Sequence, residues 1–356
     1  MVPVVDLSRR GRAAAGEFAA TVTRIVESGS RLLGDETAAF ERELAAWLEP
    51  VRSPRLQPLE VVAVSSGASA LQLALAAVGV GAGDEVIVPA FTAVPTAAAV
   101  CALGATPVPV DVEPGTANLD NALVAAATTA RTKAVIVVHL YGRPAQRPDT
   151  ELPVIDDAAQ AQGAIRDHRA ADIVAYSFYP TKNLGGIGDG GAVVTADVEI
   201  AERVRRLRVH GMTAMYVHTE ISQNFRMSEI EAAWLRLGLP LLSADNERRR
   251  QIAARYRAAA PDAGWQDAHV DHVYHLCVLR SADRARVRDA LAEAGVATAI
   301  HYPLALTQQP GYWKFRAAPC PQAEAWAAEC LSVPCFPELT DQEIEHVAGA
   351  LAAVLT

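Results

Sequence analysis

The chain has 356 residues and a formal net charge of −9, and 51% of its residues are hydrophobic while 21% are charged. This composition is typical of a globular protein with one large domain and a smaller companion. A general attraction to nucleic acid is not expected because the net charge is negative. A membrane-spanning helix is not expected because no run of about 18 apolar residues occurs.

The N-terminal stretch MVPVVDLSRR meets an acidic residue before the apolar core of a signal peptide could form. We therefore expect no secretory signal and a cytoplasmic location. The five cysteines are odd in number and show no CxxC spacing. We expect reduced, packed thiols, with neither a disulfide framework nor a metal site.

Short β-branched runs alternate with alanine-rich, helix-length segments in the first part of the chain. They predict seven strands, at residues 61–64, 85–88, 107–110, 134–138, 153–156, 172–178 and 191–195. Because these runs are apolar on both faces, we expect a buried, mainly parallel sheet covered by helices. This α/β unit forms the predicted large domain over residues 1–240.

After the seventh strand the pattern changes to long amphipathic helices, and a smaller α+β unit follows. Its predicted strands are 273–280 and 296–303, and its predicted helices are 284–295 and 341–355. We assign residues 241–356 to this C-terminal domain, on which the N-terminal segment is free to pack.

The stretch VVAVSSGASALQLALAAVG runs from the first predicted strand directly into a helix that Gly79 ends. A helix that begins at the carboxyl end of a buried strand presents unpaired N–H groups to an anion such as phosphate. A serine N-cap on an ordinary helix uses the same residues, so SSGAS alone leaves both interpretations open.

Polar residues also follow the fifth and sixth predicted strands. The stretch PVIDDAAQAQG supplies Asp156, Asp157 and, one predicted helical turn later, Gln160, while YSFYPTKNLGG supplies Ser177 and Lys182. The carboxyl ends of strands in open α/β sheets form ligand sites. Helix capping explains one of the two aspartates easily but the second less well.

These groups together suit pyridoxal phosphate. The cofactor's aldehyde needs an amine for a Schiff base, its ring nitrogen needs an acid and its phosphate needs a cup of small residues. The glycine-rich GGIGDGG lacks the strand and helix of a dinucleotide fingerprint and the ending of a P-loop. We interpret it as a tight turn.

Motifs in the same order along almost the whole chain resemble those of the DegT/DnrJ/EryC1/StrS aminotransferases. They include FERELAAWL, GAGDEVIVPAFTAVPTA, LGATPVPVDVEP, VHLYG, IDDAAQAQG, SFYPTKNLG, GDGGAVVT, NFRMSEIEAA and AIHYP. The resemblance implies the aspartate-aminotransferase fold (fold type I), pyridoxal 5'-phosphate as the cofactor and a homodimer with active sites at the subunit interface.

The resemblance also assigns roles to single residues. Lys182 would form the Schiff base, Asp157 would bind the pyridine nitrogen and Gln160 the phenolic oxygen. Asn224 would reach the phosphate from the other subunit. The remaining phosphate-binding positions match Gly67, Ala68, Ser69 and Ser177.

The chain departs from the family pattern at several positions. Ala68 stands where the family has threonine, Ala93 where many members stack an aromatic ring on the pyridine, and Glu231 where glutamine is common. The segment between YGRPA and PVIDD is shorter than expected, which predicts a shortened helix there.

The resemblance implies amino transfer from a donor such as glutamate to a ketone on a nucleotide-linked deoxysugar, giving an amino sugar for a natural product or glycan. The Lys182 amine would shuttle the proton. The candidates for lining the sugar site are His301, Tyr302, Tyr216 and His218, for each of which ordinary packing or surface exposure is an equal alternative.

Three other functions are considered. A keto-cyclitol aminotransferase or aminobenzoate-type synthase of the family would use the same residues on a carbon ring. The dehydratase branch replaces the lysine with histidine, and Lys182 argues against it. A non-catalytic regulator with this fold could lose Lys182 or Asp157 without penalty, yet both are present.

Overall fold

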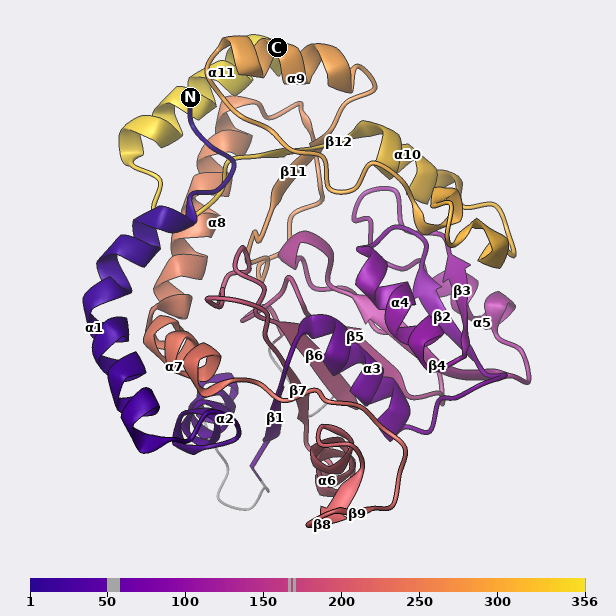
Figure 1. Cartoon of the computed structure of the whole chain (residues 1–356). Helices are drawn as coiled ribbons and strands as arrows, with labels where there is room; N and C mark the ends of the chain where they lie inside the picture. Colours follow the sequence, from indigo (N-terminus) through magenta and orange to yellow (C-terminus); the bar gives the residue numbers. More distant parts are fainter. Residues whose placement is uncertain (50–57, 166–167, 169–170, 356) are drawn as a thin grey trace.

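The computed structural model describes residues 1–49, 58–165, 168 and 171–355. Figure 1 shows a large domain built on one sheet and a smaller domain near the two chain ends. In the described part of the chain, no helix has the length and apolarity needed to cross a membrane.

The large domain contains the seven predicted strands, all of which the structure confirms. They are β1 (Glu60–Val64), β2 (Glu85–Pro89), β3 (Thr106–Val110), β4 (Thr132–Val138), β5 (Val154–Asp157), β6 (Ile173–Ser177) and β7 (Gly191–Thr195). Their order in the sheet is β1-β7-β6-β5-β4-β2-β3. Only β7 runs antiparallel to its neighbours, so the sheet is mainly parallel, as expected.

Helices cover both faces of this sheet because its strands are apolar on both sides. In β1, Val62 and Val64 join a core cluster with α3 (Gly67–Ala77), α4 (Val94–Ala102) and α6 (Val198–Leu207). Val61 and Ala63 face the other side, toward α2 (Asp35–Leu48) and α7 (Glu229–Gly238). A smaller cluster under β2, β3 and β4 includes Val124 of α5 (Asn121–Ala127).

The smaller domain packs helices on a three-stranded antiparallel sheet of order β10-β11-β12. Its elements are α8 (Leu242–Ala259), β10 (Gly264–Trp265), β11 (Cys277–Arg280), α9 (Arg284–Glu293), α10 (Pro321–Glu329), β12 (Cys330–Val333) and α11 (Asp341–Leu355). This confirms an α+β C-terminal unit. The boundary predicted at residue 240 coincides with the short 3-10 turn Leu239–Leu241 and stays a prediction.

Two strand predictions in this domain were wrong in extent or position. The strand predicted at 273–280 is only β11, because the N–H groups of Val273 and Leu276 bond to the turn at 141–142 in the large domain. The strand predicted at 296–303 forms only isolated bridges, at Val296 and Ala299. The chain then leaves the sheet, and β12, which the sequence did not suggest, takes the place beside β11.

The shortened helix predicted between YGRPA and PVIDD is also wrong, since residues 143–153, all described, form no helix. Three prolines, at 144, 148 and 153, interrupt this segment, and proline removes backbone donors that a helix needs. Arg147 fastens the segment to the sheet through Asp156, at 3.3 Å.

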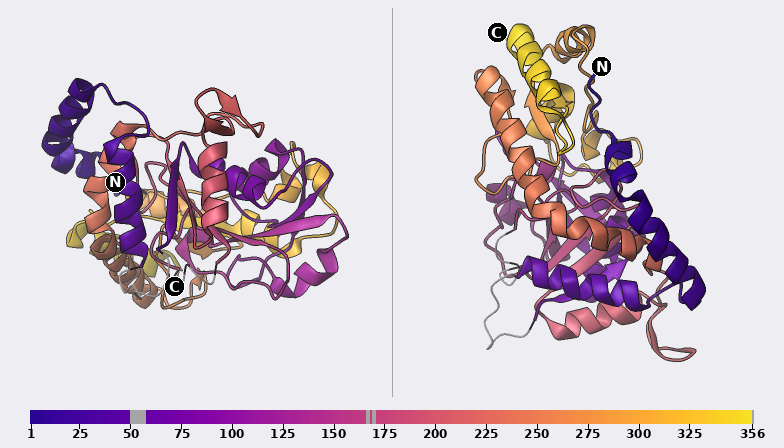
Figure 2. Two further views of the ribbon diagram at one scale, coloured as in Figure 1. Left: turned by 90° about the horizontal axis from the view of Figure 1, so that it is seen from below. Right: turned by 90° about the vertical axis from the view of Figure 1, so that its left-hand side faces the viewer.

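The N-terminal segment lies against the smaller domain. Val2 exchanges backbone hydrogen bonds with Gly295 and Ala297. At the start of α1 (Leu7–Ser28), Arg9 forms an ion pair of 2.6 Å with Glu343. Figure 2 shows α1 at the edge of the molecule, and the hairpin of β8 (Met212–Ala214) and β9 (Val217–His218) projecting from the body.

Candidate active site

A cavity of about 280 Å³, which we call the inner cavity, opens at the carboxyl ends of the sheet strands. Its walls come from the segments that follow β1, β2, β5 and β6, which is where open parallel sheets place their ligands. The predicted site residues that line it are Gly67, Ala68, Asp157, Gln160, Ser177 and Lys182.

The loop after β1 forms one end of the inner cavity. Ser66 caps α3 by accepting a hydrogen bond from the backbone N–H of Ser69, at 3.0 Å. A Cβ atom at Gly67 would lie 2.5 Å from Cβ of Ser177, so only glycine fits between helix and strand here. The capping interpretation is therefore correct, and the remaining N–H groups of the helix start stay available to an anion.

The Ser69 side chain is less available than predicted. Its hydroxyl lies 2.9 Å from that of Ser65 and 2.8 Å from that of Ser66, and the residue does not line the cavity. Ser69 therefore stabilises the turn, and the serines that line this end of the cavity are Ser66 and Ser177.

Asp157 is buried at the end of β5 with both carboxylate oxygens occupied. Thr96 Oγ1 donates to Oδ2 at 2.8 Å, and the N–H of Ala159 donates to Oδ1 at 3.2 Å. Burial raises the pKa of Asp157, while these two donors and the positive charge of Lys182 oppose the rise.

Thr96 lines the inner cavity and bonds Asp157, and the sequence analysis missed it. It is fully buried, and its hydroxyl lies 3.1 Å from that of Thr92, four residues earlier. The signal was the pair of threonines in FTAVPTA, which one turn at the start of α4 brings together.

Asp156 has a different environment, which explains the second aspartate of the pair. Successive residues of a strand face opposite sides of the sheet, and Asp156 Oδ1 lies 3.4 Å from Nε2 of His139. Nδ1 of that histidine accepts the N–H of Ala145 at 2.9 Å. Together with Arg147, these groups form a network that holds β4, β5 and the loop between them together.

Gln160 lies on a series of turns and not on the helix that the spacing suggested, because Ala161 and Ala164 bond to residues three positions earlier. Its Oε1 accepts the N–H of Tyr141 at 2.6 Å, and its Nε2 donates to the hydroxyl of Tyr302 at 3.0 Å. Burial raises the pKa of Tyr302 to about 12, so this phenol is neutral near pH 7.

Lys182 follows β6 and reaches the inner cavity from a turn that is closed by its own N–H bonding to the carbonyl of Tyr179, at 2.8 Å. Burial lowers the pKa of its amine to about 8, and the negative charge of Asp157 opposes this change. Roughly a tenth of the amine is therefore neutral at pH 7, which makes it a reactive nucleophile.

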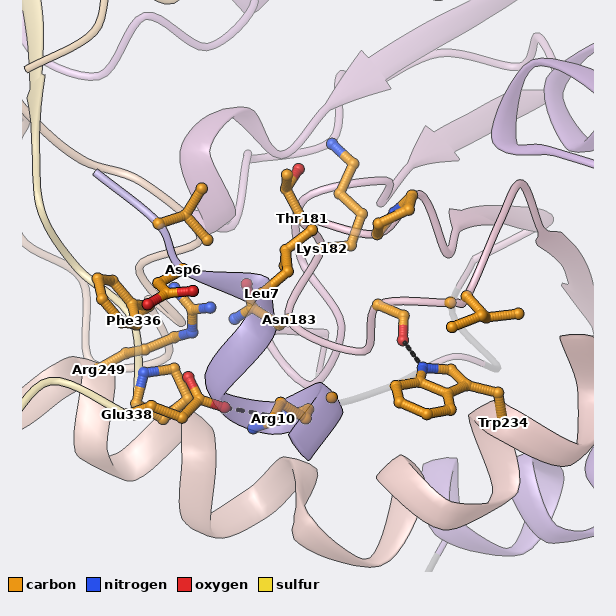
Figure 3. A pocket seen from close by; sticks show the side chains of 17 residues that line it. Asp6, Leu7, Arg10, Thr181, Lys182, Asn183, Trp234, Arg249, Phe336 and Glu338 are labelled. Carbon is orange, nitrogen blue, oxygen red and sulfur yellow. Dashed lines mark hydrogen bonds and ion pairs between the residues drawn. The ribbon is translucent and has the colours of Figure 1, made fainter. Parts of the chain in front are cut away.

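The glycine-rich segment after Lys182 is a turn supported by α7. Oε2 of the buried Glu231 accepts the N–H of Gly188 at 2.8 Å, and Nε1 of Trp234 donates to the carbonyl of Gly185 at 3.0 Å. A Cβ atom at Gly186 would collide with the Glu231 carboxylate. Figure 3 shows Trp234 bonded in this way below Lys182.

A second cavity of about 370 Å³, the outer cavity, lies next to the inner one and shares Tyr179, Lys182 and Tyr302 with it. Its walls come mainly from the smaller domain and the N-terminal segment. The lining residues are Val4, Val5, Tyr179, Thr181, Lys182, Arg249, His275, Leu276, His301, Tyr302, Val333, Cys335 and Phe336. Two predicted sugar-site residues, His301 and Tyr302, thus lie beside Lys182.

The other predicted residues are not brought to these cavities by this chain. Asn224 is exposed, and its Oδ1 accepts Nε of Arg226 at 2.8 Å. Tyr216 and His218 lie exposed on the β8–β9 hairpin. Ala93, by contrast, lines the inner cavity as the N-cap residue of α4, so the position at which an aromatic ring was considered has only a methyl group here.

Comparisons with known proteins agree in family and fold. The model of the DegT/DnrJ/EryC1/StrS aminotransferase family matches residues 13–352. The erythromycin biosynthesis sensory transduction protein EryC1 of Saccharopolyspora erythraea is 41% identical, over 99% of this chain and 99% of its own length. A dTDP-3-amino-3,4,6-trideoxy-alpha-D-glucose transaminase of Streptomyces venezuelae is 40% identical, over 98% of this chain and 95% of its own. The crystal structure of S. venezuelae DesV superimposes with a TM-score of 0.91 at 39% identity, covering 99% of this chain and 98% of DesV.

Proposed function

The chain belongs to the DegT/DnrJ/EryC1/StrS aminotransferase family, and from this premise we propose that it transfers an amino group from an amino acid to a ketone on a nucleotide-linked deoxysugar. It is a pyridoxal-phosphate-dependent transaminase. Relatives named as transaminases of dTDP-linked and UDP-linked amino sugars support this class of acceptor. The product would be an amino sugar for a natural product or a glycan.

The inner cavity fits pyridoxal phosphate by the chemistry of its donors. One end offers the start of α3 and the Ser177 hydroxyl for the phosphate, and Gly67 lets these two groups lie close together. The other groups are the Asp157 carboxylate for the ring nitrogen and the Gln160 amide for the phenolic oxygen. Ala68 contributes only its backbone N–H.

When bound, pyridoxal phosphate supplies an aldehyde carbon that takes up the amino group and a ring that withdraws electrons from the reacting carbon. Asp157 would hold a positive charge on the ring nitrogen, and the buried Thr96 hydroxyl would orient the carboxylate for this contact. Lys182 would hold the cofactor through Nζ, and the free Nζ would take the proton from Cα of the amino donor. Its pKa of about 8 suits an amine that must alternate between these two forms near neutral pH.

The observation that carries the proposal is the meeting of a depressed-pKa lysine and a buried, hydroxyl-supported carboxylate in one cavity at the edge of the sheet. The EryC1 relative has a name that describes sensory transduction. A non-catalytic regulator needs neither the reactive amine nor the carboxylate, so their presence favours catalysis.

Glutamate as the donor, a cytoplasmic location and a homodimer are further parts of the proposal. The exposed hairpin and the segment after it support the dimer, since Met215 and Ile221 are 81% and 103% exposed and would be covered by a second subunit. The segment after the hairpin also contains the exposed Asn224, which we assign to the phosphate of the partner's cofactor, and the hairpin contains the sugar-site candidates Tyr216 and His218.

A mixed-subunit experiment tests the shared site. We expect that Lys182→Ala and Asn224→Ala homodimers each lose activity, whereas mixing and reassembling the two restores part of it, because one of the two sites in a hybrid is then intact. No recovery in verified hybrids would contradict a site built from two subunits.

A substrate panel tests the acceptor. Purified enzyme with glutamate is given nucleotide-linked keto-sugars and, separately, keto-cyclitols, and products are followed by mass spectrometry for the replacement of a carbonyl oxygen by an amine. Amination of a nucleotide-linked sugar is expected. Amination of the carbocycle alone would favour the cyclitol or aminobenzoate alternative, and no amination with any acceptor would contradict the proposal.

A further inference from the structure

We propose, on the basis of the function proposed above, that the outer cavity binds a carboxylate of the amino donor and that Arg249 is the group that binds it, with His275 beside it. Both residues line this cavity together with Lys182. Neither was singled out by the sequence analysis.

The outer cavity lies where the carboxylate of an amino donor must be. In an amino acid, the α-carboxylate is attached to the same carbon as the reacting amino group, so it must lie within a few ångströms of Lys182 Nζ during transfer. Lys182 and Tyr302 separate the two cavities, and the cofactor occupies the inner one in the proposed function. Two spaces then remain beside the amine: the outer cavity, and a smaller cavity of about 150 Å³ that Asp6 and Glu338 line together with Lys182 and Arg249. The outer cavity is the larger of the two and has no carboxylate in its lining.

The lining of the outer cavity favours an anion. Its lining contains two cations, Lys182 and Arg249, and two histidines, but no aspartate or glutamate, although the chain has 41 acidic and 32 basic residues. Burial and the nearby positive charges lower the pKa of His275 and of His301. Both imidazoles are therefore neutral near pH 7, and they can donate hydrogen bonds to an anion without adding charge.

The hydrogen bonds of Arg249 leave part of its guanidinium without an acceptor. The residue is 5% exposed, and among the described residues Nη1 of its guanidinium makes all of the side chain's hydrogen bonds, to the carbonyls of Tyr274, His275 and Cys335. Its buried Nε has no acceptor there. Burial lowers the pKa of this guanidinium, which a bound anion would reverse.

Glu338 and Asp245 oppose the lowering of the Arg249 pKa, but both carboxylates are paired with another arginine. Arg10 forms ion pairs with Glu338 at 2.7 Å and with Asp245 at 2.5 Å. Figure 3 shows the contact of Arg10 with Glu338 beside Arg249. A buried guanidinium held by carbonyls alone, with Nη2 unbonded among the described residues, is costly unless an anion joins it. The planar guanidinium of Arg249 keeps free N–H donors, and their arrangement matches the two oxygens of a carboxylate.

Binding of succinate to the holoenzyme, measured by calorimetry, tests the site without requiring turnover. We expect wild type to bind succinate, and Arg249→Lys and Arg249→Gln to bind it about 10- to 100-fold more weakly, which is what the loss of one charge-assisted contact amounts to. The matched control is Arg255→Gln on the same helix, whose partner Glu345 is exposed, and it should bind succinate as wild type does. Inorganic phosphate in place of succinate separates a carboxylate site from a general anion site.

The two half-reactions give the second measurement. Removing Arg249 should raise KM for glutamate by a similar factor while the amine form of the enzyme still reacts with the keto-sugar at the wild-type rate. Unchanged succinate binding and an unchanged KM for glutamate would overturn the assignment, as would tighter binding of phosphate than of succinate. If wild type reacts with no amino acid at all, the proposed function itself would be overturned.

Because Arg249 also ties three carbonyls, its variants need a folding check by thermal melting. If neither variant folds, His275→Leu decides, since it leaves those carbonyl bonds in place. We expect it to weaken succinate binding and raise the glutamate KM about fivefold or more, and wild-type values for both would overturn the proposal.

Discussion

The inner and outer cavities meet at Lys182 but have opposite electrostatic character. The inner cavity has Asp157 at the end of β5, with Thr96 and a backbone N–H bonded to its oxygens. The outer cavity has Arg249 and two neutral histidines, and no carboxylate lines it. The large domain supplies most of the first cavity, while the smaller domain and the N-terminal segment supply most of the second.

This difference shows how one amine can serve two ligands. The carboxylate side suits a cofactor ring that must stay positively charged, and the cationic side suits a substrate that brings a negative charge. Lys182 is influenced from both directions, because burial lowers its pKa and Asp157 raises it. Removing Lys182 should therefore affect both ligands, whereas changing one residue in the wall of either cavity should affect mainly the ligand of that cavity.

Removing the lysine should have the largest effect. Lys182→Ala should lower the rate of amino transfer by at least about 1,000-fold, because both the covalent attachment and the proton transfer are lost. The matched control, Lys133→Ala, changes an exposed lysine of β4 and should be indistinguishable from wild type in steady-state kinetics. Turnover by Lys182→Ala at the rate of the control would remove Lys182 from the mechanism.

Neutralising the acid of the inner cavity should have the next largest effect. Asp157→Asn keeps the shape of the side chain but loses its charge, so we expect kcat to fall about 100-fold or more and the cofactor to bind more weakly. The neighbouring Asp156→Asn should instead lower the Tm, because it breaks the pairs with His139 and Arg147. Equal effects of both variants on kcat would contradict the different roles of the two aspartates.

The hydroxyl behind Asp157 should have a smaller effect. Thr96→Val has nearly the same volume but no donor for Oδ2, and we expect about tenfold losses in kcat and in cofactor affinity. Thr96→Ser keeps the donor and should recover most of both. Spectroscopic titration of the bound cofactor provides the readout, and wild-type values for Thr96→Val would show that this hydroxyl does not orient the carboxylate.

The support beneath the lysine turn should affect stability more than rate. Burial raises the pKa of Glu231 from 4.5 to about 7, so the folded state keeps a proton that the unfolded state has lost. The free energy of unfolding contributed by this residue is therefore highest below about pH 4.5 and decreases as the pH rises to 7. Relative to wild type, Glu231→Gln should gain on the order of 2 kcal/mol between pH 4.5 and 7. Urea unfolding at several pH values measures this, and a constant difference would contradict it.

Local sequence patterns predicted the large domain well. Its strands are buried on both faces, so each appears as a short apolar run such as Val61–Val64, and the residues that follow each strand necessarily share one edge of the sheet. Asp157, Ser177 and Lys182 could be placed near one another for this reason.

The smaller domain and the outer cavity could not be predicted in the same way. The segment 296–303 has the composition of a strand, but it leaves the sheet after one bridge at Ala299 to bring His301 and Tyr302 to the cavity. Arg249 stands in a run of three arginines, residues 248–250, and its neighbours in the sequence do not distinguish it from them. Its burial depends on contacts with residues 25 to 86 positions later in the chain, and no local pattern encodes these.

The most direct test of the central claim is the absorption spectrum of the purified holoenzyme during titration with glutamate in the absence of a keto acceptor. We predict a visible band from pyridoxal phosphate bound at Lys182, which glutamate converts to the shorter-wavelength absorbance of the amine form, and which Lys182→Ala lacks. A spectrum that no amino acid changes, or a normal band in Lys182→Ala, would contradict the assignment of Lys182 and the aminotransferase mechanism built on it.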